Sequence, residues 1–180
     1  MSDTILDAAR SVFEQYGARR ANVDDIAAAA GVSRSTLYRR YATKDDLLAA
    51  VVMRETETFL DDLDAVAADL PPQEAVIECF TRGLRIMRDI PVIGRLAQSE
   101  PEVIARIADG NHVVLSQSDR IARTLRRSGA TMPDAELVLA AEILLRLAST
   151  YLMNPEGHLD LTDEHAVRDY AKRYLSPLVN

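Results

Sequence analysis

The sequence predicts an all-helical protein of about nine helices in two domains. Apolar residues recur at intervals of three and four along most of the 180 residues, which is the period of an amphipathic helix. No segment shows the strict alternation of a half-buried strand, and Gly and Pro residues separate the periodic segments. We expect an N-terminal domain of three helices over residues 1–44 and a second helical domain over residues 45–180.

The three helices of the first domain are predicted from periodicity and from end signals. The first covers residues 4–16, is ended by Gly17, and has a buried face of Ile5, Ala9, Val12, Phe13 and Tyr16. Two short helices follow within residues 22–48 and meet at Gly31, a residue free to adopt positive φ. Asn22 caps the first of these and Ser33 the second, because both side chains accept bonds from helical N–H groups.

The helix that begins after Ser33 has one apolar and one polar face. Leu37 and Tyr41 share the side predicted to be buried. The exposed side carries guanidinium and hydroxyl groups, which suit base edges and phosphates, on Arg34, Ser35, Thr36, Tyr38, Arg39 and Arg40. No acidic residue occurs between Ala27 and Thr43. A helix-Gly-helix pattern by itself is equally typical of an ordinary helical corner with a solvated basic face.

Motifs on both sides of this turn resemble those of the tetracycline-repressor (TetR) family. Phe13 and Gly17 match the end of that family's first helix, and residues 26–33 match its turn motif, Ile-Ala-x-x-Ala-Gly-Val-Ser. Leu37, Tyr38, Tyr41 and Lys44 follow at the family's spacing. The resemblance covers residues 4–50 and implies an N-terminal helix-turn-helix DNA-binding domain followed by a ligand-binding and dimerisation domain.

The resemblance also implies which residues contact double-stranded DNA. They are Asn22, Ser33, Arg34, Ser35, Thr36, Tyr38, Arg39, Arg40 and Lys44. Tyr38 and Lys44 match the family's usual phosphate contacts. Asn22 stands where the family often has threonine, and Ser35 where it commonly has glycine, so the operator sequence does not follow from the motif.

The net charge of −7 is unevenly distributed. Residues 1–44 hold seven Lys or Arg and five Asp or Glu, whereas residues 45–180 hold fourteen and twenty-three. The first domain can therefore attract phosphate while the acidic remainder discourages non-specific binding. The polar N-terminus lacks the apolar segment of a signal peptide, and Glu142 and Arg146 interrupt the longest apolar stretch. We expect a cytoplasmic protein with no membrane span.

Six helices are predicted for the second domain. They cover residues 43–70, residues 73–89, a short segment from Pro91, residues 101–128, residues 134–153 and residues 162–178. Thr43 and Asp46 form a capping box at the start of the first, and Pro71 and Pro72 end it. In the last, Val167, Tyr170, Tyr174 and Leu178 are aligned on one face.

The helix over residues 134–153 is apolar on nearly every side, and a chain of this length has few segments to cover it. A central core helix of a monomer is one interpretation. The other, which the family resemblance implies, is a homodimer through this helix and residues 162–178. Two reading helices about one turn of DNA apart would then read a palindromic operator. The resemblance further implies that a small organic effector changes their separation and lowers DNA affinity.

Candidate effector-binding residues combine apolar surface with a few polar groups: Phe59, Phe80, Leu84, Met87, Asn111, Ser116 and Tyr151. Apolar residues at helical spacing are also typical of an ordinary core. Arg82, Arg85 or Arg88 offers an alternative, a site for an acidic ligand.

Enzyme, metal and cofactor sites are not predicted. His112, His158 and His165 are scattered, and the sequence has no glycine-rich phosphate loop. Cys79 lies among apolar residues, which favours a structural thiol. Two functions remain: a ligand-responsive transcriptional repressor that binds DNA as a homodimer, or an all-helical dimeric module that binds a small molecule or protein and keeps an idle helix-turn-helix.

Overall fold

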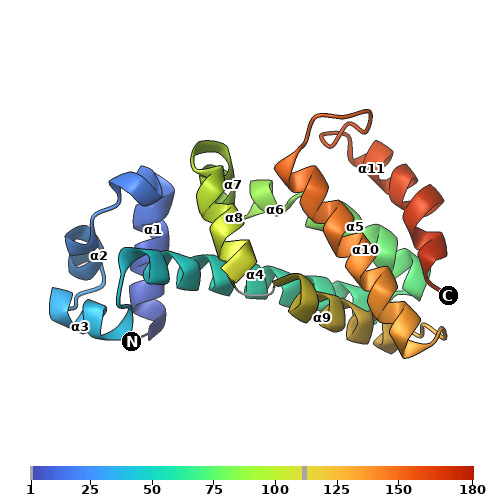
Figure 1. Cartoon of the computed structure of the whole chain (residues 1–180), viewed down its shortest axis with the longest axis horizontal. Helices are drawn as coiled ribbons and strands as arrows, with labels where there is room; N and C mark the ends of the chain where they lie inside the picture. Colours follow the sequence, from blue (N-terminus) through green and yellow to red (C-terminus); the bar gives the residue numbers. More distant parts are fainter. Residues whose placement is uncertain (1, 111–112) are drawn as a thin grey trace. The chain divides into compact units, whose positions relative to one another are not determined.

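A computed structural model describes residues 2–110 and 113–180, and every regular element in those ranges is helical (Figure 1). The prediction of an all-helical fold is confirmed. The elements are α1 Ser2–Arg20, α2 Val23–Ala29, α3 Arg34–Arg40, α4 Lys44–Ala68, α5 Pro72–Gly83, α6 Ile86–Asp89, α7 Pro91–Ser99, α8 Pro101–Gly110, α9 Val113–Arg127, α10 Asp134–Met153, α11 Glu164–Tyr170, the π-helix η1 Ala171–Leu175 and the 3₁₀-helix η2 Ser176–Leu178. None of the described helices is long and apolar enough to cross a membrane.

The chain divides into two compact units. The first contains Met1–Thr58 and Met87–Ile107, and the second contains Phe59–Ile86 and Ala108–Asn180. Helix α4 contributes to both units. The functional boundary at residue 44 remains a prediction, because a division by packing does not say which residues bind DNA.

The core of the first unit joins the N-terminal helices to α7. Ile5 and Phe13 of α1 and Leu37 of α3 are fully buried, and α1 packs against both α2 and α7. The predicted face of α1 is correct except at Tyr16, which is 44% exposed. The buried stripe passes from Phe13 to Gly17 instead, where the backbone leaves the helical conformation.

The second unit is built around α5, α9 and α10. Phe80 of α5, Leu125 of α9 and Ala141 of α10 belong to one buried cluster. The predicted helix over residues 73–89 is divided into α5 and α6, because α5 ends at Gly83, a residue with low helix propensity. The predicted helix over residues 101–128 corresponds to α8 and α9, and residues 111–112 lie outside the described ranges.

The C-terminal segment differs from the predicted single helix. After α11 the chain forms a π turn and then a 3₁₀ turn. A π turn has more residues per turn than an α-helix, which favours a four-residue spacing of the buried side chains. Residues buried at this spacing are Val167, Ala171, Leu175 and Val179, whereas Tyr174 is 56% exposed. The prediction that Tyr174 shares the buried face of Val167 is therefore wrong.

Candidate nucleic-acid interface

Local hydrogen bonds fix the turn between α2 and α3. Gly31 adopts φ 65°, and the amides of Gly31 and Val32 donate to the carbonyls of Ala28 and Ala27 at 3.1 and 3.0 Å. The Asn22 side chain accepts from the amide of Asp24 at 3.0 Å and caps α2. Ser33 caps α3 through a bond from the amide of Thr36 at 3.1 Å. The predicted positive φ and both predicted caps are confirmed.

Helix α3 has the two faces that its sequence predicts. Leu37 is fully buried, while Tyr41 is half-buried just beyond the end of the helix. Of the nine residues predicted to contact DNA, Thr36 and Lys44 are half-buried and the others are exposed: Asn22, Ser33, Arg34, Ser35, Tyr38, Arg39 and Arg40. The fold thus brings the predicted contacts of α3 onto its solvent side, where a DNA groove can reach them.

The basic side chains of α3 differ in their contacts. The Arg34 guanidinium lies 3.1 Å from a carboxylate oxygen of Asp24, and its central carbon lies 5.5 Å from the centre of the Tyr38 ring. Arg39 and Arg40 make no side-chain hydrogen bond or ion pair to any other described residue. Two guanidinium groups are therefore available for bases or phosphates without breaking a protein contact, whereas a third shares its charge with a carboxylate.

Lys44 has a second role that the sequence did not predict. Its ammonium donates to the backbone carbonyls of Arg19 and Ala21, both at 3.2 Å. Arg19 lies in the last turn of α1 and Ala21 directly after it, so the side chain ties the start of α4 to the end of α1. An ammonium has three donors, which leaves one proton for the predicted phosphate contact.

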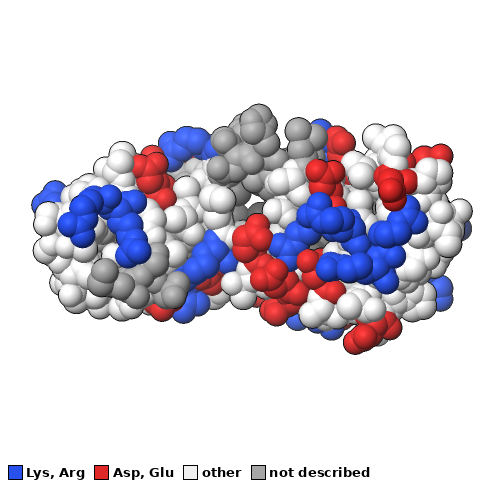
Figure 2. All heavy atoms as spheres, turned by 90° about the horizontal axis from the view of Figure 1, so that it is seen from below, with Lys and Arg blue, Asp and Glu red and all other residues white. Residues whose placement is uncertain are grey.

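The surface charge differs between the two units (Figure 2). At the left end of the view, over the N-terminal helices, Lys and Arg atoms form a patch with few acidic atoms beside them. At the right, over the second unit, Lys and Arg atoms are interleaved with Asp and Glu atoms. Within the first unit, the patch has the character of an anion-binding surface.

The predicted effector-binding residues are only partly brought together. Phe80 and Tyr151 are in edge-on contact with ring centres 6.4 Å apart, and Leu84 and Tyr151 both pack against the buried cluster of the second unit. Ser116 is exposed and Phe59 is half-buried outside that cluster. Asn111 and the side chain of Met87 lie outside what the structure describes.

Tyr170, which the sequence analysis did not select, completes the aromatic group around Tyr151. Its ring stacks on Phe80 at 6.3 Å and meets the Tyr151 ring edge-on at 5.9 Å. A hydrogen bond to Tyr151, together with burial, raises the pKa of Tyr170 to about 12. Three aromatic side chains from α5, α10 and α11 thus form one cluster, in which the two tyrosines carry hydroxyl groups.

The arginines considered for an acidic ligand are engaged by the protein. Arg82 pairs with Glu78 at 2.6 Å and Arg85 pairs with Glu164 at 3.1 Å. The side chain of Arg88 is not described. These contacts favour an effector that is recognised by apolar and hydroxyl groups over an acid held by free guanidinium groups.

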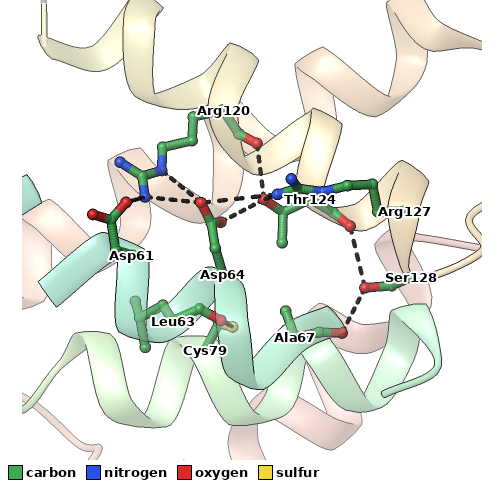
Figure 3. A network of polar contacts seen from close by, with 9 residues as sticks. All are labelled: Asp61, Leu63, Asp64, Ala67, Cys79, Arg120, Thr124, Arg127 and Ser128. Atoms are coloured by element: carbon green, nitrogen blue, oxygen red, sulfur yellow. Dashed lines mark hydrogen bonds and ion pairs between the residues drawn. The ribbon is translucent and has the colours of Figure 1, made fainter. Parts of the chain in front are cut away.

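A network of polar contacts connects α4 to α9 within the second unit, and no sequence pattern predicts it (Figure 3). Arg120 donates to Asp64 at 2.8 Å and to Asp61 at 2.6 Å, and the Thr124 hydroxyl donates to Asp64. The Ser128 hydroxyl donates to the carbonyl of Ala67 at 2.8 Å. These pairs are about 60 residues apart in sequence, and only covariation among homologues would have indicated them.

Cys79 of α5 is a half-buried free thiol. Burial raises the pKa of the Cys79 thiol to about 12, and the thiol donates to the carbonyl of Leu63 at 3.6 Å. A thiol held in its neutral form is a poor nucleophile, which agrees with the structural role predicted for it. Among the described residues, no three His, Cys, Asp or Glu side chains form a group able to hold a metal ion.

Comparisons with known proteins identify the fold and the family. The model of the bacterial regulatory proteins of the tetR family matches residues 5–51. An uncharacterized HTH-type transcriptional regulator of Mycobacterium tuberculosis is 29% identical over 168 residues, which cover 92% of this chain and 80% of that protein. The HTH-type transcriptional regulator RutR of Escherichia coli is 34% identical over 92 residues, covering 51% of this chain and 43% of RutR.

A solved structure extends the similarity of fold to the whole chain. The TetR family repressor AlkX from Dietzia sp. superposes with a TM-score of 0.76 at 22% identity, and the match covers 98% of each chain. The family consists of transcription regulators and not of enzymes. From the motif match, the exposed face of α3 and the shared fold, we conclude that this chain belongs to the TetR family of DNA-binding transcriptional regulators.

Proposed function

We propose that the protein is a repressor that binds a palindromic operator as a homodimer and is released from it by a small organic effector. The observation that carries this proposal is the face of α3. Its guanidinium and hydroxyl groups are exposed, and Arg39 and Arg40 have no partner among the described residues. Repression by occupying the operator needs no surface beyond this one and the dimer contact.

The dimer is supported by the uncovered side of α10. Leu137, Ala141 and Leu144 are buried in the second unit, but Leu139 and Ile143 are 61% and 51% exposed. Arg146, which pairs with Glu142 at 2.7 Å as its spacing predicts, continues the same side of the helix. Large apolar side chains exposed on one helical stripe are typical of a contact with a second chain.

Dimerisation would also explain how one short helix selects an operator. A single reading helix contacts only a few base pairs, whereas two related by a two-fold axis contact half-sites roughly 34 to 36 Å apart. An effector can bind more tightly to a dimer whose reading helices have a different separation than to the DNA-binding form. DNA affinity then falls by up to the ratio of the effector's affinities for these two forms. The aromatic cluster of Phe80, Tyr151 and Tyr170 is the proposed contact surface for an aromatic or aliphatic effector that carries a polar group.

DNA recognition can be tested by selection from a random DNA pool with the purified protein. We expect the selected sequences to contain an inverted repeat, and log affinity for them to fall linearly with log salt concentration. Binding of the selected DNA should be lost on addition of one or more members of a panel of small aromatic and aliphatic compounds. Failure to bind any DNA at low salt would contradict the proposal and would favour the idle helix-turn-helix.

The dimer can be tested separately with Ile143→Glu. A carboxylate on the uncovered stripe of α10 should be tolerated in the monomer but should disrupt an apolar contact between copies, which light scattering would detect as a halved mass. Met53→Glu is the matched control, because Met53 of α4 is also an exposed apolar residue, at 45%. A monomeric wild-type protein, or an Ile143→Glu variant that remains dimeric, would contradict the proposed interface.

A further inference from the structure

We infer that Glu100, at the corner between α7 and α8, is a positioning residue that couples this corner to the DNA-reading head through the turn formed by residues 17–21. This inference rests on the proposed function, since it concerns how a change elsewhere in the protein reaches α3. It would act beside Lys44 of α4, whose ammonium binds the carbonyls of Arg19 and Ala21.

The contacts of Glu100 are unusual for a charged residue. Its side chain is only 6% exposed, and its carboxylate accepts hydrogen bonds from the backbone amides of Ala18 at 2.8 Å and Arg19 at 3.1 Å. The Arg19 guanidinium lies 3.9 Å from the same carboxylate. A buried carboxylate persists only where donors replace water, so these amides are the reason the charge can lie there.

The Glu100 carboxylate lies so close to Gly17 that no larger side chain fits at that position. Its backbone adopts φ 76° and ψ 170°, which interrupts α1 and exposes the amides of Ala18 and Arg19 as donors. A Cβ atom at this position would lie 2.8 Å from the Glu100 carboxylate. The glycine is required twice, once for its positive φ and once for the approach of the carboxylate.

The other side of the 17–21 turn is held by Lys44. As described above, its ammonium binds the carbonyls of Arg19 and Ala21. The turn is therefore held by its amides from the α7–α8 corner and by its carbonyls from the first residue of α4. It leads directly to Asn22, the cap of α2, so a displacement of the turn would move α2 and the α3 that follows it.

The backbone of Glu100 also makes hydrogen bonds to both helices of the α7–α8 corner. Its amide donates to the carbonyl of Leu96 in α7 at 2.7 Å, and its carbonyl accepts from the amide of Val103 in α8 at 2.9 Å. One residue thus joins the end of α7, the start of α8 and the end of α1. A change in the angle between α7 and α8 would displace the carboxylate and, with it, the two amides of the turn.

Amide hydrogen exchange of the full chain, with and without the DNA selected by the wild type, tests this coupling. In the wild type, DNA should slow exchange at the amides of Glu100 and Val103, because coupling between two sites is reciprocal. In Glu100→Gln, which keeps the shape but lacks the charge, this effect should disappear. The amides of Ala18 and Arg19 should exchange at least about tenfold faster, and affinity for the selected DNA should fall about tenfold.

Glu102→Gln is the matched control. Glu102 lies two residues away, pairs with the same Arg19 at 2.6 Å and loses the same charge on substitution, but its side chain is 55% exposed. We expect its DNA affinity and its DNA-dependent exchange to equal those of the wild type. If Glu100→Gln unfolds the N-terminal helices, Glu100→Asp provides the same comparison, because it keeps the charge but shortens the reach to the two amides.

The outcomes separate the coupling from the proposed function. A wild type that binds no DNA would overturn the proposed function and the coupling with it. If the wild type binds DNA and a Glu100 variant still shows slower exchange of the Val103 amide when DNA is added, the coupling alone is overturned. An equal loss of affinity in Glu102→Gln would also overturn it, since the effect would then follow from charge at the corner and not from the buried contact.

Discussion

The arginines of α3 and those of α9 are the same residue type in opposite situations. Arg39 and Arg40 are exposed and have no partner among the described residues. Arg120 is 15% exposed and binds two carboxylates, and Arg126 pairs with Asp134 at 2.6 Å while donating to the carbonyls of Ala130 and Met132. Both helices are rich in arginine, but Arg120 and Arg126 of α9 are neutralised within the protein, whereas Arg39 and Arg40 of α3 are not.

A run of basic residues therefore predicts a nucleic-acid surface only where the protein does not itself neutralise the charge. Carboxylates of the protein neutralise Arg120 and Arg126 of α9, and removing either guanidinium should cost stability. On α3 the charge is left for the ligand, and removing it should cost DNA affinity. Four substitutions test this division, in order of decreasing expected effect.

Arg120→Ala should lower the free energy of unfolding by about 3 kcal/mol, since it leaves the partly buried Asp64 without its main cation. The measurement is chemical denaturation followed by circular dichroism. Arg123→Ala, an exposed arginine one turn further along α9, is the control and should change stability by less than about 0.5 kcal/mol. Equal losses in both variants would show that the network in Figure 3 adds no stability.

Arg39→Ala should reduce affinity for the selected operator by about 2 kcal/mol, because a guanidinium that reads a base is lost. Affinity for random DNA should change much less, and stability should stay within about 0.5 kcal/mol of the wild type. Fluorescence anisotropy with both DNAs provides the measurement. A loss of equal size on random DNA would assign Arg39 to the phosphate backbone instead.

Lys44→Ala should weaken binding to all DNA sequences alike, by about 1 kcal/mol, and should reduce the slope of log affinity against log salt by about one. The structure adds an effect on the protein itself, because the carbonyls of Arg19 and Ala21 lose a donor. Titrations at several salt concentrations separate the two contributions. An unchanged salt slope with reduced affinity would mean that Lys44 acts only through the 17–21 turn.

The smallest expected effect is on the acid limb of the stability curve. The hydrogen bond from Arg168 lowers the pKa of Glu78, with a further contribution from Arg82. A carboxyl group with a depressed folded pKa adds stability that is complete above its unfolded pKa and is lost as the pH falls through the folded one. Glu78→Gln should therefore flatten stability against pH below about pH 5. Thermal unfolding across that range would contradict the assignment if both proteins lost stability in parallel.

What could be predicted from the sequence was local. Gly31, the caps at Asn22 and Ser33 and the buried Leu37 follow from interactions within a few residues, and the structure contains all four. The contact between Glu100 and Ala18 spans 82 positions, and that between Asp64 and Arg120 spans 56. A single sequence does not indicate which polar groups far apart in the chain contact each other, so these two contacts were not predicted.

The same limit applied to side-chain direction near helix ends. Tyr16 and Tyr174 were placed on buried faces because an ideal α-helix continues through them. Glycine interrupts the first helix at the next residue, and a π turn changes the spacing of the last. The candidate effector residues stay a prediction for a related reason, since periodicity identifies apolar faces but does not tell a cavity wall from a filled core.

The pair between Arg34 of α3 and Asp24 of α2 means that one arginine of the proposed reading helix already has a counterion within the protein. When Arg34 turns to a phosphate, a condensed cation is released from the DNA, but the carboxylate left behind again attracts cations from solution. The two exchanges oppose each other, so fewer ions should be displaced on binding than a count of arginines on α3 suggests. The protein's affinity for DNA should therefore fall less steeply with rising salt concentration than that count suggests.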